Sequence, residues 1–233
     1  MNDPKVIVAL DFDDRSAMQK LLSGLDPKSC RVKVGKEMFT LYGPDIVKYL
    51  HDQGFQVFLD LKFHDIPATV KKACRAAAGL GVWMLNVHAL GGKEMLLAAK
   101  EGVIEAGTNS KLIAVTILTS SNAEDINRVG IVGDVDKNVL QLARLVDECG
   151  LDGVVCSARE AVMLRSNTSP SFLLVSPGIR PSGSLVNDQK RVVTPAKAIE
   201  DGVSYLVIGR PITQAERPSE VLSEINQEIS ICL

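Results

Sequence analysis

Charged side chains are concentrated in one short stretch of the chain, the sequence DLKFHD at 60–65. Asp60 and Lys62 are two residues apart, so on an extended strand both side chains project to the same face. A carboxylate and an ammonium beside apolar strands are costly unless they pair or take part in chemistry. One interpretation is a structural ion pair. The other is a proton-handling site, in which flanking carboxylates hold the lysine as an ammonium.

Further polar residues lie where other apolar segments end. Asp11 and Lys33 end neighbouring segments, so they could extend Asp60 and Lys62 into an array of alternating lysines and aspartates that needs no metal. Corresponding positions are held by His88, Thr119, Cys156, Arg180, Gly209 and Arg210. We interpret His88 as a rim histidine that is hydrogen-bonded within the fold, and Cys156 as a core residue.

The elements that must position these residues are short apolar segments at 5–10, 31–35, 56–60, 83–88, 112–118, 153–156, 172–178 and 205–209. Most of them are continuously apolar, which favours parallel strands covered on both faces. Helix-like stretches separate them, at 37–53, 67–80, 91–107, 138–149, 195–201 and 218–227. Eight units in 233 residues average about 29 residues each, close to the size of a βα repeat.

This alternation predicts an α/β fold, with one (β/α)₈ TIM-barrel domain spanning residues 1–233. A doubly wound open sheet is the alternative. However, no GxGxxG motif follows the first segment, so a Rossmann cofactor site is unsupported. In a barrel the functional site lies at the carboxyl ends of the strands, which is where the polar residues stand.

Composition excludes several classes of function. The 26 Lys and Arg residues are balanced by 28 Asp and Glu residues, which disfavours a general binder of nucleic acid or of anionic membranes. No apolar stretch approaches the roughly 18 residues of a membrane span, and the first residues lack the apolar core of a signal peptide. The five cysteines form no CxxC pair, so we expect neither a zinc site nor a disulfide framework, and a reducing cytoplasmic setting.

The last segments carry the features of a phosphate site. Gly209 allows backbone N–H groups to approach an anion closely, and Arg210 adds a guanidinium beside them. Barrels often bind phosphate at the loops after strands seven and eight. The stretch 179–191 contains Gly183 and Gln189 and is interpreted as a loop that closes over the phosphate. The alternative for Arg210 is a solvated arginine at the start of a helix.

With these residues in view, the chain resembles the orotidine 5′-phosphate decarboxylase family. The resemblance runs through VALDF, VKVGKEMFTLYGP, DLKFHDIPATV, GVWMLNVHALGG, IAVTILTS, GLDGVVCSA, SPGIRPSG with DQKR, and VIGRPIT. These motifs cover essentially the whole chain, in the family's order. The DxKxxD element alone is shared with related barrel enzymes, whereas the complete set is specific.

The resemblance implies decarboxylation of orotidine 5′-phosphate to UMP and CO₂, the last step of de novo pyrimidine synthesis, without metal or cofactor. It implies that Asp60, Lys62 and Asp65 are catalytic, with Lys62 protonating C6 of the ring. The implied substrate contacts are Asp11, Lys33, Thr69, Thr119, Arg180, Gln189, Gly209 and Arg210. It also implies a homodimer in which Asp65 serves the partner's active site.

Two rival functions fit parts of the pattern. A related phosphosugar barrel could use DxKxxD to hold Mg²⁺ and act as an aldolase or a β-keto acid decarboxylase. A barrel of another class could bind a phosphorylated metabolite without turning it over. Loss of activity on chelation would favour the first, and tight binding without turnover would favour the second.

Overall fold

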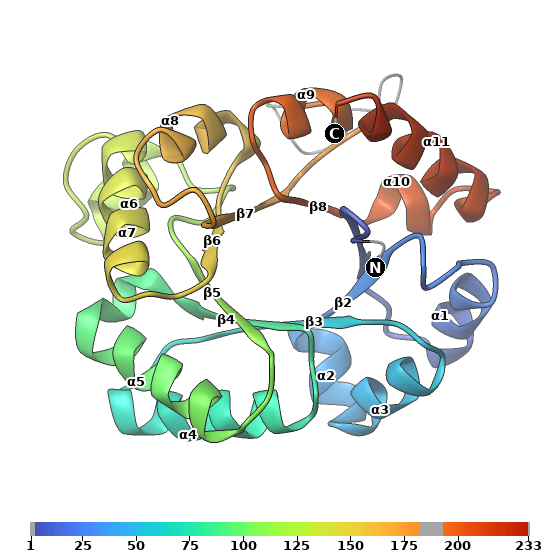
Figure 1. Cartoon of the computed structure of the whole chain (residues 1–233), viewed down its shortest axis with the longest axis horizontal. Coiled ribbons are helices and arrows are strands. Elements are labelled where there is room, and N and C mark those ends of the chain that lie inside the picture. The colour runs from blue at the N-terminus through green and yellow to red at the C-terminus, as the bar shows by residue number, and fades with distance from the viewer. Residues whose placement is uncertain (1–2, 182–192, 233) are drawn as a thin grey trace.

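Eight parallel strands close into a barrel in the order β1 to β8, and helices surround it as an outer layer (Figure 1). The computed structural model describes residues 3–181 and 193–232. The strands are β1 Val6–Leu10, β2 Arg31–Gly35, β3 Val57–Phe63, β4 Met84–His88, β5 Lys111–Val115, β6 Gly153–Val155, β7 Leu173–Pro177 and β8 Tyr205–Ile208. Each coincides with one of the apolar segments, so the barrel prediction is confirmed and the open-sheet alternative is wrong.

The helices are α1 Arg15–Leu22, α2 Lys36–Tyr42, α3 Asp45–Asp52, α4 Pro67–Gly79, α5 Gly92–Glu105, α6 Ala123–Arg128, α7 Val135–Glu148, α8 Ala161–Arg165, α9 Pro195–Glu200, α10 Arg210–Thr213 and α11 Pro218–Ser230, with 3₁₀ turns η1 Ala89–Gly91 and η2 Ala158–Glu160. The helix-like stretch at 37–53 forms two helices, α2 and α3. Gly43 ends α2 in a left-handed conformation (φ 60°), and Pro44, which has no N–H, begins the approach to α3.

Side chains inside the barrel fill it with an apolar layer, made up of Ile7, Ala9, Phe58, Met84, Ile113, Val175, Tyr205 and Val207. Successive side chains of a strand alternate between the inside and the outside. Two residues beyond Ala9, Phe58 and Met84, the strands therefore direct the next side chains inward, above this layer. Those side chains are Asp11, Asp60 and Asn86. The polar residues are thus stacked on an apolar floor at the carboxyl ends of the strands.

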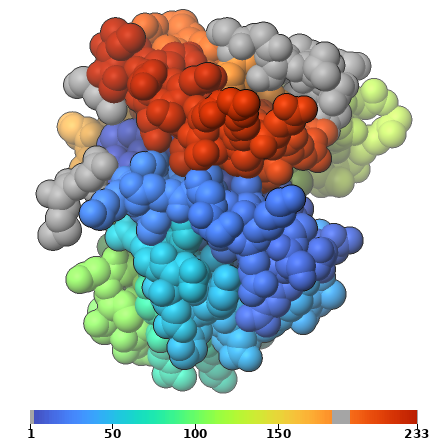
Figure 2. All heavy atoms as spheres, turned by 90° about the vertical axis from the view of Figure 1, so that its right-hand side faces the viewer, coloured from blue at the N-terminus to red at the C-terminus, as the bar shows by residue number. Residues whose placement is uncertain are grey.

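The ring is closed by pairing of β1 with β8. As a result, α10 and α11 at the C-terminal end lie beside the N-terminal part of the chain, as Figure 2 shows from the side. The other end of the barrel is sealed by Arg31, whose guanidinium lies 3.9 Å from the centre of the Trp83 ring. Among the described helices, none is long and apolar enough to cross a membrane.

Candidate active site

A cavity of about 290 Å³ opens at the carboxyl ends of the strands. Its lining includes seven of the residues singled out in the sequence, namely Asp11, Lys33, Asp60, Lys62, Arg180, Gly209 and Arg210. Apolar side chains, Phe58, Val155 and Val207 among them, line its deeper part. Residues from five strand ends far apart in the sequence therefore meet in one hollow of mixed charge and apolar character.

The lysines and aspartates alternate along one side of this cavity. Lys62 Nζ lies 2.6 Å from Asp60 Oδ1, and Lys33 Nζ lies 3.4 Å from Asp60 Oδ2. Lys33 Nζ is also 3.2 Å from Asp11 Oδ1. The array expected from the strand ends is therefore present, and Asp60 stands between the two lysines.

Asp60 is 8% exposed and carries a charge in a largely apolar setting. Burial alone would raise its pKa. The charges of Lys33 and Lys62, with hydrogen bonds from Lys62 and Asn86, outweigh burial and hold the pKa of Asp60 below its usual value. The carboxylate is therefore ionised at neutral pH and fixes the ammonium of Lys62 beside the cavity.

The backbone at Lys62 is unusual. Among the described residues, Lys62 is the one non-glycine residue with a positive φ, at 54°. The register between β3 and β4 also shifts between Leu59 and Phe63. Asp60 and Lys62 are in contact, although the backbone at Lys62 is not that of the regular extended strand that the two-residue spacing assumed.

Asn86 was not anticipated from the sequence. It is fully buried on β4 and bonds both halves of the DLK segment. Its Nδ2 donates to Asp60 Oδ1 at 2.7 Å, and its Oδ1 accepts from the backbone N–H of Lys62 at 2.8 Å. The available signal was a single amide in an otherwise apolar strand, because a buried polar group requires partners.

Two arginines also line this cavity. Arg180 follows β7 and Arg210 begins α10, directly after β8, which pairs with β1. Gly209 joins β8 to α10 close to Asp11, since an added Cβ there would lie 3.9 Å from Asp11 Oδ2. Two guanidinium groups beside exposed backbone form a surface suited to an anion such as phosphate.

Three of the anticipated residues that the structure describes do not line this cavity. Asp65 is exposed and its Oδ1 accepts from the N–H of Ile66 at 2.6 Å. Thr69, in the first turn of α4, and Thr119, beyond β5, are also exposed and absent from the lining. Gln189 lies outside the described residues. Within the described chain, Lys62 is paired with Asp60 and not with Asp65.

His88 departs from its expected role. Its Nδ1 is buried and has no hydrogen-bond partner among the described residues, so the expected bond within the barrel is absent. Burial, together with His64, Lys36 and Lys62 nearby, lowers the pKa of His88 to about 4. The imidazole is therefore neutral at pH 7. Cys156 is fully buried as expected, and burial raises the pKa of its thiol to about 12.

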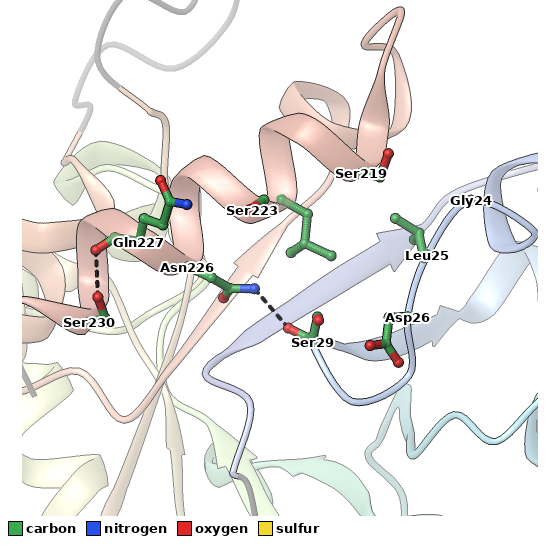
Figure 3. A pocket seen from close by; sticks show the side chains of 10 residues that line it. Gly24, Leu25, Asp26, Ser29, Ser219, Ser223, Asn226, Gln227 and Ser230 are labelled. Carbon is green, nitrogen blue, oxygen red and sulfur yellow. Dashed lines mark hydrogen bonds between the residues drawn. The ribbon is translucent and has the colours of Figure 1, made fainter.

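A second cavity, about 380 Å³, lies between α11 and the segment that leads into β2 (Figure 3). Asn226 spans part of it by donating to the backbone oxygen of Ser29 at 3.0 Å. The lining consists of serines, amides and leucines, and its one titratable side chain is Asp26. It lies near the amino end of β2, away from the carboxyl ends of the strands, and offers no cation for a phosphate.

Comparisons with known proteins match nearly the whole chain. The family model described as "Orotidine 5'-phosphate decarboxylase / HUMPS family" matches residues 4–225. A protein of Hydrogenovibrio crunogenus named orotidine 5′-phosphate decarboxylase is 57% identical over 227 residues, which cover 97% of this chain and 96% of the relative. One of Vibrio cholerae with the same name is 56% identical over 230 residues, covering 98% and 100%.

Solved structures also match nearly the whole chain, in fold as well as in sequence. The crystal structure of orotidine 5′-phosphate decarboxylase from Lactobacillus acidophilus has a TM-score of 0.87 and 43% identity, and the match covers 97% of this chain and 99% of that one. A conserved protein of Geobacillus kaustophilus gives a TM-score of 0.84 and 40% identity, covering 96% and 99%.

Proposed function

The chain belongs to the orotidine 5′-phosphate decarboxylase / HUMPS family, and on that premise we propose that it converts orotidine 5′-phosphate to UMP and CO₂. The observation that carries the proposal is the alternating array of lysines and aspartates that lines one cavity together with two arginines. The names of the relatives support this substrate over a phosphosugar. The reaction would complete the de novo synthesis of UMP.

The chemistry required is stabilisation of negative charge at carbon. When the bond from C6 to the carboxylate breaks, the electron pair stays at C6, where no adjacent carbonyl can readily delocalise it. A fixed ammonium beside C6 stabilises this charge and then donates the proton that replaces CO₂. Lys62 would supply both functions, and its amine would regain a proton from water. These steps require no metal or cofactor.

Asp60 would act chiefly through Lys62. Its ionised carboxylate, 2.6 Å from Nζ, keeps the ammonium charged and oriented toward the cavity. Near the substrate carboxylate it would also add like-charge repulsion, which is relieved as CO₂ departs. Lys33 and Asp11 would contact the ribose. Their ion pair forms the end of the array away from Lys62 and would hold the two side chains in place.

The phosphate would bind on the arginine side. Arg180 and Arg210 with the backbone of Gly209 provide the donors, and Gln189 with its loop would complete them. The separation of an anion-binding side from a proton-donating side suits a substrate whose phosphate and reacting carbon lie at opposite ends. Thr119 would contact the pyrimidine, a role that remains a prediction.

We further propose a homodimer with shared sites. Ten large apolar side chains are exposed in the described part of the chain, and four of them are Leu41, Ile66, Leu90 and Leu118, at 55, 66, 44 and 46%. The last three follow β3, β4 and β5, which are neighbours in the barrel. Exposed apolar side chains on neighbouring connections support an interface at this rim. A partner docked here would bring Asp65 and Thr69, which flank Ile66, toward the opposing cavity.

The test is an absorbance assay with orotidine 5′-phosphate, with and without EDTA. We expect UMP formation that EDTA leaves unchanged. Activity lost on chelation would instead support the metal-dependent phosphosugar barrel. Tight binding of orotidine 5′-phosphate or UMP without turnover would support a binding protein, and either result would overturn the proposed function.

A further inference from the structure

Asn86 occupies a position that neither the motifs nor the cavity lining identify. It is fully buried on β4, its amide bonds both Asp60 and Lys62, and it is not among the residues that line the cavity. We propose that Asn86 is a positioning residue, which sets the Lys62 ammonium against Asp60 by holding the backbone of Lys62 in its left-handed conformation. The activity part of this inference rests on the proposed function.

The first step concerns the backbone. A left-handed conformation is strained for a residue with a Cβ. It persists only where contacts with the surrounding structure hold the backbone in place. At Lys62 the regular ladder is interrupted, because the register between β3 and β4 shifts between Leu59 and Phe63. The N–H of Lys62 is instead bonded by Asn86 Oδ1. Asn86 thus replaces the missing strand partner at the residue where the chain turns.

The second step concerns the carboxylate. Asn86 Nδ2 donates at 2.7 Å to Asp60 Oδ1, the same oxygen that accepts from Lys62 Nζ at 2.6 Å. This donor fixes the rotation of the carboxylate and leaves Oδ2 directed toward Lys33. An amide supplies a directional donor without adding a charge, so the balance of the array is undisturbed. One side chain therefore sets both the backbone and the counter-ion of Lys62.

Two substitutions remove these contributions, one in part and the other completely. Asn86→Asp keeps the shape and the acceptor for the N–H of Lys62, but it removes the donor to Asp60 and adds a second carboxylate. Asn86→Leu is similar in size and removes both bonds. The matched control is Thr116→Val, just beyond β5, which removes another fully buried polar group whose hydroxyl bonds the backbone oxygen of Val155.

Three readouts distinguish positioning from structural support. For both Asn86 variants we expect kcat to fall about 100-fold, the loss typical of a roughly 1 Å misplacement, while the dissociation constant of UMP changes less than about threefold. The acid limb of the kcat/KM profile should move to higher pH, because Asp60 loses a donor that favours its ionised form. Thr116→Val should change neither kcat nor the acid limb.

The crystal structure of the Asn86→Leu protein provides a test that does not depend on activity. We expect the φ of Lys62 to become negative and its Nζ to move out of hydrogen-bond range of Asp60. If Asn86→Leu does not fold, the kinetics and crystal structure of Asn86→Asp test the proposal instead. The expected change in that structure is loss of the 2.6 Å contact between Lys62 Nζ and Asp60 Oδ1.

Variants that bind UMP fully and retain kcat within threefold of wild type would overturn the proposal. So would an unchanged Lys62 geometry in the variant crystal, or equal losses of kcat and UMP affinity that Thr116→Val reproduces. A wild-type protein that does not turn over orotidine 5′-phosphate would instead refute the proposed function, and the crystallographic test of Asn86 would still stand.

Discussion

Lys62 Nζ and Asp60 Oδ1 are 2.6 Å apart, although the backbone between them departs from a regular strand at Lys62, where φ is 54°. The contact is therefore made by a residue with a strained backbone rather than within a regular strand. Strain of this kind costs about 1–3 kcal/mol and is concentrated at functional sites. The ammonium lines the cavity, which is the placement that the proposed proton donation to a carbanion would require.

The arginine side of the cavity should contribute to the reaction at a distance. Arg210→Ala is expected to lower kcat/KM by an amount that corresponds to a loss of about 2–4 kcal/mol in transition-state stabilisation, because it removes a charged partner of a buried phosphate. Orotidine without its phosphate should be a very poor substrate, and added phosphite should partly restore its turnover. Steady-state kinetics with nucleotide and nucleoside measure both effects. Equal turnover of the two substrates would contradict this assignment.

The shared-site arrangement can be tested by complementation. Lys62→Ala and Asp65→Ala proteins should each be inactive, and mixing equal amounts under subunit exchange makes half of the dimers hybrids. If Asp65 acts in the partner's site, each hybrid has one intact site of two, so about a quarter of wild-type activity returns. Labelled subunits should be used to establish that exchange has occurred. Confirmed exchange with no gain in activity would show that Asp65 serves its own chain or none.

His88 should make stability depend on pH. Burial lowers its pKa to about 4 in the folded protein, against about 6.5 when unfolded. Between these values the unfolded chain binds more protons, so the free energy of unfolding should fall as the pH drops from 7 toward 4. Allowing for solvent screening of this partly exposed ring, the loss is roughly 1–2 kcal/mol.

Urea unfolding at pH 7 and pH 5 and at fixed protein concentration measures this loss. His88→Gln, which cannot titrate in this range, should reduce the difference between the two pH values. The control is Thr116→Val, which should retain the wild-type difference. If the free energy of unfolding differs as much between pH 7 and pH 5 in His88→Gln as in wild type, another group causes the pH dependence.

Much of the site follows from the sequence because its residues stand where apolar strands end. Parallel strands in a barrel bring their carboxyl ends to one rim, so Asp11, Lys33, Asp60 and Arg210 could be assigned to one cavity before their distances were known. The break between α2 and α3, within the helix-like stretch at 37–53, is marked in the sequence by Gly43-Pro44.

The remaining features depend on contacts between elements. The left-handed conformation of Lys62 arises from the register shift between β3 and β4 and from the bonds of Asn86. No local pattern in DLKFHD encodes it, because lysine has no preference for that region. In the proposed dimer, the positions of Asp65 and Thr69 relative to a cavity would depend on the second chain, which the spacing along one chain does not specify.

The most direct test of the account is the rate of decarboxylation by Lys62→Ala. Loss of proton donation costs about 10²–10⁴ in rate and loss of a preorganised charge about 10²–10³, together roughly 5–9 kcal/mol if the effects add. Single-turnover measurements with orotidine 5′-phosphate should show this loss, while UMP binding, which depends on the arginine side, changes far less. A loss of less than tenfold, with the chemical step shown to be rate-limiting, would contradict the assignment of Lys62.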